Sequence, residues 1–319
     1  RFQKRLDDYE ENRHFFLAKY FRDNYEQALS ELPIINSNIN ITKIEVWVTN
    51  VGAPLTENRN ILALQDLGEQ QAYNRLFSPR TNQRYPYNSV NNLKQIIDTS
   101  RVRSISNVTS YLQSGGLNLI SGIDYEKVEL ARKLRPSEYT INRKLGFISL
   151  NSRINPDQIL AVSYQYTVIG DQRIYQVGEF SDQGVVAPNT LMVKLLKSTA
   201  TNTQTDLWKL MMKNVYNIGA YQVNREDFSL NILYTGGADG VPKGYLAEGP
   251  EAVKGANLLE VMRLDRLDQQ YNPTADGVFD FIDEAALSGG TIQASNGRIY
   301  FPMLEPFGAF LRRQLVDNS

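Results

Sequence analysis

The stretch FFLAKYFRDNYEQALSELPIINSNINITKIEVWVTN, residues 15–50, contains the change of hydrophobic period on which the expected fold depends. From Phe2 to Leu32, apolar and aromatic side chains recur mostly at steps of three and four residues. That spacing predicts a helix with one buried side. Pro33 lacks an amide hydrogen and clashes with a preceding helical turn, so the helix is expected to end near Leu32.

Alternation replaces the helical period after the polar turn. Ile44, Val46 and Val48 share one side of an alternating segment, and Trp47 falls on the other. A period of two predicts a strand, and the face that carries Ile44, Val46 and Val48 is expected to be buried. Residues 60–66 are expected to form its partner strand. Further strands are predicted at 139–142, 147–150, 160–168 and 191–197, with a turn ending at Gly146 between the first two of these.

The second half of the chain mixes helical and alternating patterns. Thr205 can cap a helix over residues 206–216, and Asn296–Gly297 suits a hairpin turn between 291–294 and 298–301. We therefore expect an α+β fold, mostly antiparallel and sandwich-like, with a few short helices. Its predicted domains are a helical lead-in at 1–35, a β-rich domain at 36–200 and an α+β domain at 201–319.

Composition excludes several classes of protein. The 34 basic and 35 acidic residues nearly cancel, so no overall field attracts nucleic acid. Cysteine is absent, which removes disulfides, thiolate nucleophiles and cysteine-ligated metals. No apolar run approaches the ~18–20 residues of a membrane-spanning helix. The chain is therefore expected to be a water-soluble part of whatever protein contains it.

Long segments of the chain resemble one family along most of its length. They are residues 15–50 quoted above, DYEKVELARKLRPSEYTINRKLGFISLNSRINPDQILAVSYQYT (124–167), YQVGEFS (175–181), LWKLMMKNVYNIGAYQV (207–223), DGVFDF (276–281) and NGRIYFPMLEPFGAFL (296–311). These stretches are similar to the SprA/Sov family, the giant outer-membrane proteins of the type IX secretion system and gliding motility in Bacteroidetes.

The resemblance implies a function in protein transport. The family forms a very large β-barrel translocon in the cell envelope, and this chain would be a soluble fragment of it. The implied partners are other secretion-system subunits, secreted cargo proteins and the rest of the parent barrel chain, with no nucleic acid. Two alternatives stay open, a carbohydrate- or protein-binding β-sandwich of a surface adhesin and an envelope glycosidase.

Candidate catalytic residues are few. His14 is the only histidine, so a Ser–His–Asp triad would rest on it alone, and an exposed or partner-facing position on the first helix is the better interpretation. The carboxylates Asp7, Asp8, Glu10 and Glu11 interleave with basic residues as on a solvated helix face. We therefore expect no enzymatic activity, no catalytic residue and no cofactor.

Two further positions attract binding hypotheses. In NPTADGVFDFID, residues 272–283, oxygen-bearing side chains around Gly277 follow the spacing of a calcium loop, with Asn272, Asp276, Asp280 and Asp283 as the candidate ligands. An ordinary β-turn before a strand is the competing interpretation. Trp208 lies about 100° around the predicted helix from Leu207, so it is a candidate anchor for a partner protein.

Overall fold

The computed structural model describes residues 2–53, 57–114, 116–236, 240–247, 249–251 and 253–316. Its chain divides into two compact units. Unit 1 comprises residues 1–10, 25–37 and 213–319, and unit 2 comprises residues 11–24 and 38–212. The domain boundaries near residues 35 and 200 stay a prediction from the sequence. The two units described below are groups of residues that contact one another in the structure.

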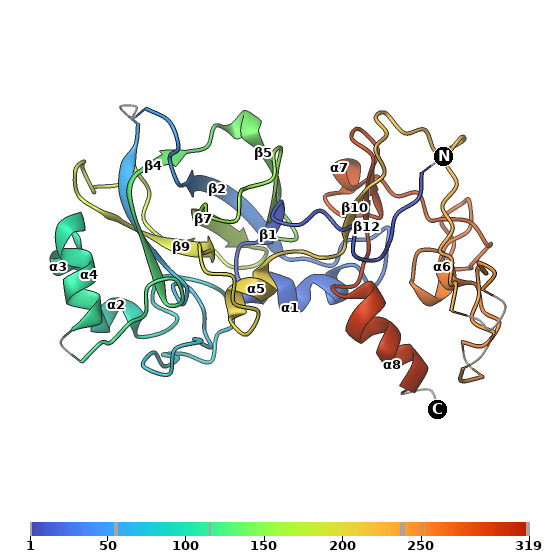
Figure 1. The fold of residues 1–319 in the computed structure, drawn as a ribbon, viewed down its shortest axis with the longest axis horizontal. Helices are drawn as coiled ribbons and strands as arrows, with labels where there is room; N and C mark the ends of the chain where they lie inside the picture. Colours follow the sequence, from blue (N-terminus) through green and yellow to red (C-terminus); the bar gives the residue numbers. More distant parts are fainter. Residues whose placement is uncertain are drawn as a thin grey trace. The chain divides into compact units, whose positions relative to one another are not determined.

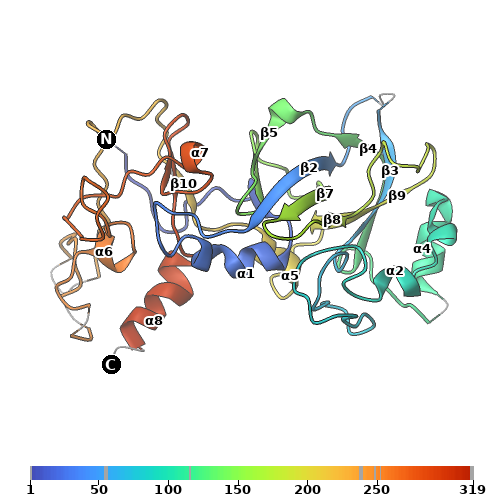
Figure 2. The same cartoon turned by 180° about the vertical axis from the view of Figure 1, so that it is seen from behind.

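A closed sheet forms the centre of unit 2 (Figures 1 and 2). Its strands run in the order β2-β4-β3-β9-β7-β8, and a further pairing of β2 with β7 closes the ring. Only β3 and β9 run parallel; the other pairs are antiparallel. The strands are β2 (Ile39–Val48), β3 (Arg59–Leu64), β4 (Tyr125–Lys133), β7 (Leu160–Val168), β8 (Ile174–Val177) and β9 (Leu191–Lys197).

The predicted α+β class, mostly antiparallel with a few short helices, is confirmed. Where the sequence analysis expected a sandwich-like arrangement, unit 2 has one sheet that closes on itself. One strand partnership was wrong: β3 pairs with β4 and β9 rather than with β2. Closure explains the difference. β2 uses one edge for β7, which lies more than a hundred residues later, and the other for β4.

Both faces of β2 are covered around Trp47. Val46 and Trp47, which point to opposite faces, are both fully buried, whereas Ile44 is only partly buried. Ile44 pairs with Tyr164 in the register, and the ring of Phe21 packs against Tyr164 with 6.0 Å between centroids. The first helix therefore covers the face that carries Ile44, and Trp47 belongs to the core.

The long first helix predicted over residues 2–32 is wrong. Residues His14–Phe16 form strand β1, and only Lys19–Ala28 form helix α1. β1 pairs with β6 (Phe147–Leu150), which pairs in turn with β5 (Tyr139–Asn142). All three β1 side chains are buried, so their backbone groups need partners, and the β6 edge supplies them. The β5–β6 hairpin was predicted correctly, and its Gly146 has φ +65°, where a Cβ would overlap the Phe21 ring.

The helices of unit 2 are short: α2 (Leu93–Ile96), α3 (Thr99–Val102), α4 (Ile105–Gln113), the 3₁₀ turn η1 (Pro136–Glu138) and α5 (Asp206–Leu210). Helix α5 ends well before the predicted residue 216. Met211 leaves the helix because its backbone bridges to Phe15 of β1. Thr205 sits at the N-cap position, but its hydroxyl donates to the Asn202 carbonyl instead of capping α5.

Unit 1 has a small antiparallel sheet in the order β10-β12-β11. Its elements are β10 (Val215–Asn217), α6 (Leu258–Val261), α7 (Glu284–Leu287), β11 (Ile292–Gln293), β12 (Arg298–Tyr300), the turn η2 (Pro306–Phe310) and α8 (Leu311–Val316). The predicted β11–β12 hairpin is confirmed, with Gly297 at φ +61° in its turn. Across the described ranges, no helix is both long and apolar enough to cross a membrane.

Candidate partner-binding surface

A buried ion pair lies at the centre of the polar structure of unit 2. Nζ of Lys194 on β9 is 2.8 Å from Oε1 of Glu69, and the two side chains are 1% and 5% exposed. Lys194 also donates to the carbonyl oxygen of Gln65. The sequence carried a signal for this pair, because Lys194 interrupts the otherwise apolar run LMVKLL, and a charge in such a strand requires a partner.

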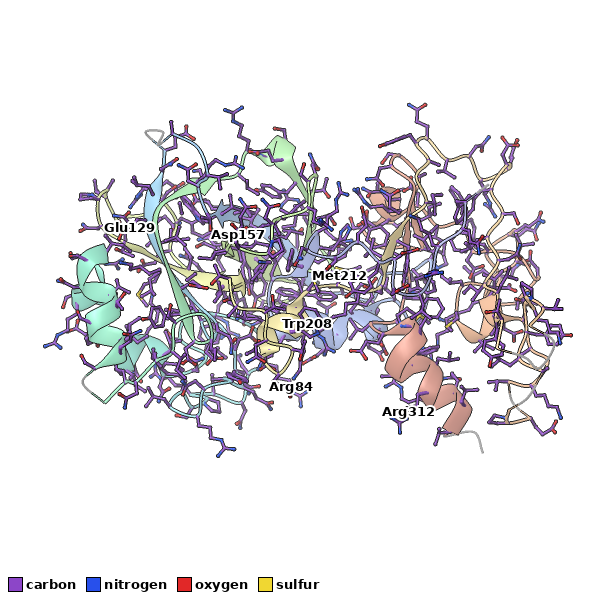
Figure 3. The ribbon with its side chains drawn as sticks, in the orientation of Figure 1. Arg84, Glu129, Asp157, Trp208, Met212 and Arg312 are labelled. Carbon is purple, nitrogen blue, oxygen red and sulfur yellow. The ribbon has the colours of Figure 1, made fainter. Side chains whose placement is uncertain are left out.

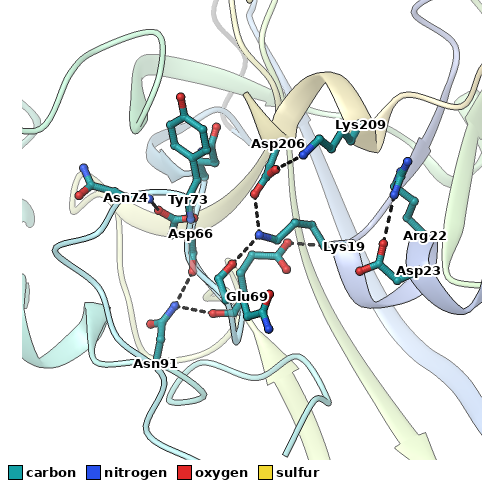
Figure 4. A network of polar contacts seen from close by, with 12 residues as sticks. Lys19, Arg22, Asp23, Asp66, Glu69, Tyr73, Asn74, Asn91, Asp206 and Lys209 are labelled. Atoms are coloured by element: carbon teal, nitrogen blue, oxygen red, sulfur yellow. Dashed lines mark hydrogen bonds and ion pairs between the residues drawn. The ribbon is translucent and has the colours of Figure 1, made fainter. Parts of the chain in front are cut away.

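The network continues from Glu69 to two helices. The backbone N–H of Lys19 at the start of α1 donates to Oε1 of Glu69 at 3.1 Å. Nζ of Lys19 donates to Oδ2 of Asp206 on α5 at 2.6 Å, and Lys209 donates to Oδ1 of Asp206 at 2.9 Å (Figure 4). Burial alone lowers the pKa of Lys19, but the carboxylates of Glu69 and Asp206 outweigh it and raise that pKa. The charged groups thus join α1, α5 and the segment after β3.

Asp66 and Asn91 hold the backbone of the segment that follows β3. Oδ1 and Oδ2 of Asp66 accept the N–H groups of Tyr73 at 2.7 Å and Asn74 at 2.9 Å. Nδ2 of Asn91 donates to the carbonyl oxygens of Asp66 at 2.8 Å and Glu69 at 2.7 Å. Burial raises the pKa of Asp66 despite these N–H bonds. Each side chain closes a turn, so this network is an anchor for a loop.

Trp208, labelled in Figure 3, lies on α5, and in the sequence it falls between Asp206 and Lys209 of this network. Leu207 and Leu210 of the same helix are buried, at 7% and 1% exposure, whereas the indole is only partly covered. A partly buried Trp on a short helix whose apolar side is buried suits a contact with another protein. The partner-binding role of Trp208 stays a prediction.

His14 does not have the exposed helical position expected of it. It is fully buried in β1, and its Nδ1 lies 2.7 Å from Oγ of Ser149, the residue opposite it on β6. Ser149 is 3% exposed. A hydroxyl beside an imidazole has the chemistry of a nucleophile and its base. Here both groups are closed off from solvent between paired strands, where the bond links β1 to β6.

The predicted calcium ligands lie in unit 1, and each carboxylate accepts backbone N–H groups. Asp280 accepts from the residues 266 and 267 at 2.8 and 3.1 Å, Asp276 from residue 278 at 3.0 Å, and Asp283 from residue 285 at the start of α7 at 3.2 Å. Nδ2 of Asn272 donates to Asp268 at 2.8 Å. Within the part of the chain that the structure describes, no group of three or more acidic or histidine side chains is arranged to hold a metal ion.

Two aspartates instead close the loop that contains those residues, a feature that the sequence analysis missed. Asp265, before the loop, accepts the N–H groups of residues 276 and 277 at 3.0 and 2.9 Å. Asp280 is near the end of the loop and accepts the N–H groups of residues 266 and 267, which precede the loop. Burial raises the pKa of both carboxyl groups, that of Asp280 to about 6. The loop is therefore held by reciprocal carboxylate–backbone bonds at its two ends.

No family model matches the chain, and no curated protein matches it significantly.

Proposed function

We propose that this chain is a non-catalytic structural and binding part of an outer-membrane protein-secretion channel of the type IX system, in the cell envelope. Its partners would be the other secretion-system subunits, secreted cargo and the rest of the parent chain. The resemblance of residues 15–50, 124–167 and 207–223 to the SprA/Sov family supports the proposal.

One structural observation supports the non-catalytic part of the proposal. The buried groups with catalytic chemistry are engaged in holding elements of the fold together. Lys194 and Glu69 join β9 to the loop after β3, His14 joins β1 to β6, and Asp280 closes a loop of unit 1. A protein that works through its surfaces needs such a rigid scaffold and no reacting centre.

The proposal is tested by genetic replacement in a bacterium that has type IX secretion and whose genome encodes the parent protein. Deleting the gene should remove type IX cargo from the culture medium. The full-length gene should restore it, and so should the gene with Ser149→Ala, which removes the hydroxyl beside His14. The level of the protein in the outer-membrane fraction is the control. Secretion that persists without the gene would contradict the channel function. A Ser149→Ala protein present at the wild-type level but unable to restore secretion would contradict the non-catalytic role.

A further inference from the structure

A long connection in unit 2 presents basic and aromatic side chains on a fixed backbone. We call residues 65–92, between β3 and α2, the basic loop; it contains no helix or strand, only a single bridge between Pro79 and Asn91. Ordered connections longer than about 12–15 residues without elements of their own are uncommon and are usually functional.

The backbone of the basic loop is held by bonds within the loop and by bonds to neighbouring elements of unit 2. Beyond the bonds made by Asp66 and Asn91, the N–H of Arg80 donates to the carbonyl oxygen of Val90 at 2.9 Å. The hydroxyl of the buried Tyr166 on β7 donates to the carbonyl oxygen of Pro86 at 2.8 Å. Asn88 exchanges side-chain bonds with Gly178, at 2.8 and 3.2 Å. The loop is thus ordered before any ligand arrives, which lowers the entropic cost of binding.

The charges that the loop exposes are all positive. Arg75, Arg80 and Arg84 are exposed, and Arg84 is labelled at the rim of unit 2 in Figure 3. Arg75 and Arg84 make no hydrogen bond or ion pair with any other residue that the structure describes. The only acidic residues of the loop, Asp66 and Glu69, are 2% and 4% exposed and serve as its anchors. From residue 70 to residue 97 the sequence contains no carboxylate at all. An incoming anionic group would therefore meet guanidinium groups that have no ion-pair partner among the residues that the structure describes.

Aromatic side chains accompany the arginines. Tyr73 is 38% exposed, and Tyr85 and Tyr87 are partly exposed. The Tyr85 ring lies 5.4 Å from the ring of Tyr20 on α1 and 5.5 Å from that of Tyr175 on β8, so its orientation is fixed. Asn, Tyr, Arg and Ser supply 13 of the 28 residues of the loop, and protein-binding loops favour these residue types.

We propose that the basic loop binds an acidic segment of a partner polypeptide, with Arg75, Arg80 and Arg84 pairing its carboxylates and Tyr73 and Tyr85 packing against its apolar side chains. The inference deepens the proposed function and rests on it for the kind of partner, a protein of the secretion assembly. Planar guanidinium groups match carboxylates in bidentate geometry, which favours this occupant over a neutral one. The overall charge of −1 gives no general attraction for nucleic acid, so a polypeptide is favoured over a polynucleotide.

Fluorescence anisotropy with the 319-residue chain tests the proposal. The probes are a fluorescein-labelled peptide of Glu-Gly-Phe-Glu repeats, its counterpart with Lys for Glu, and a labelled oligothymidylate. The wild-type chain should bind the acidic peptide and neither other probe. The triple variant Arg75→Gln, Arg80→Gln, Arg84→Gln should raise Kd at least about tenfold, because three exposed ion pairs are lost.

A matched variant controls for net charge. Lys4→Gln, Arg153→Gln, Arg312→Gln removes three cations that are exposed elsewhere on the chain, and it should change Kd less than about twofold. Equal weakening by both variants would overturn the inference, as would wild-type binding to none of the probes. Tight binding of oligothymidylate that the loop variant abolishes would reassign the loop to nucleic acid. Unchanged melting curves establish that both variants are folded.

The secretion assay separates this inference from the proposed function. If the loop variant of the full-length protein loses both peptide binding and secretion, both stand. If the chain fails to bind the peptide while gene deletion still stops secretion, the inference fails and the proposed function survives. If the peptide binds but gene deletion leaves secretion intact, the proposed function fails and the partner must be sought elsewhere.

Discussion

Replacing Lys194 by Met should strongly destabilise unit 2. The substitution keeps a long side chain in the strand but removes the charge that faces Glu69 at 2.8 Å. Glu69 is 4% exposed, so its carboxylate would lose its closest cation in a poorly solvated site, where the N–H of Lys19 still donates to it. Removing one partner of a buried ion pair costs about 3–5 kcal/mol. The carbonyl oxygen of Gln65 would also lose its donor.

A double variant separates the cost of the orphaned charge from the value of the pair. Glu69→Gln keeps an oxygen that can accept the Lys19 N–H and removes the negative charge. The combination Lys194→Met, Glu69→Gln should therefore recover stability and cost only about 1–2 kcal/mol relative to wild type. The two substitutions should be strongly non-additive, as residues in direct contact are.

The assay is denaturant unfolding followed by tryptophan fluorescence. Both tryptophans of the chain, Trp47 and Trp208, belong to unit 2, so the signal reports that unit alone. Wild type, the two single variants and the double variant complete a mutant cycle. If Lys194→Met lowers the free energy of unfolding by less than about 1 kcal/mol, the reasoning is refuted, because that is the contribution of a solvent-exposed ion pair. A double variant as unstable as the sum of the single variants would refute it equally.

Three further predictions concern other elements. Val46→Asp should cost at least about 3 kcal/mol by the same fluorescence assay, because Val46 is fully buried and an unpaired charge would enter the core; an unchanged midpoint would contradict the packing of β2. Trp208→Ala should change the stability of unit 2 by less than about 1 kcal/mol yet lower secretion by the full-length protein, whereas Leu210→Ala, at 1% exposure, should cost about 2–5 kcal/mol. If Trp208→Ala unfolds unit 2, Trp208 is a core residue and not a partner-binding one. Burial raises the pKa of Asp280 from 3.8 to about 6, so the folded state of unit 1 favours the protonated carboxyl group. The resulting stabilisation of unit 1 is complete below pH 3.8 and is lost as the pH rises through 6, by at most about 3 kcal/mol. Asp280→Asn should flatten that dependence in calorimetric melts of unit 1, and a slope identical to wild type would rule out Asp280 as its source.

Local patterns predicted those parts of the fold whose partners are close in sequence. The β5–β6 and β11–β12 hairpins follow from alternation on either side of a glycine turn, and β7 and β9 follow from their own side-chain pattern. Only backbone conformation and a short connection are needed to specify such elements. The sequence also placed Trp208 on a helix, although that helix ends at Leu210 and not at the predicted residue 216.

Long-range pairing decided the rest. Residues 14–16 fit a helical period as well as a strand, and they became β1 because β6, more than a hundred residues away, offers an edge for their buried backbone. No local pattern reveals that β2 closes the sheet onto β7 or that β3 runs parallel to β9. The anchors of the basic loop depend on the same closure, since Lys19, Glu69, Lys194 and Asp206 meet only after α1, β9 and α5 have been brought together. Sequence thus determined which segments alternate and where they turn, whereas the tertiary structure decided which edges pair, because burial of unpaired backbone and charge is a property of the assembled unit.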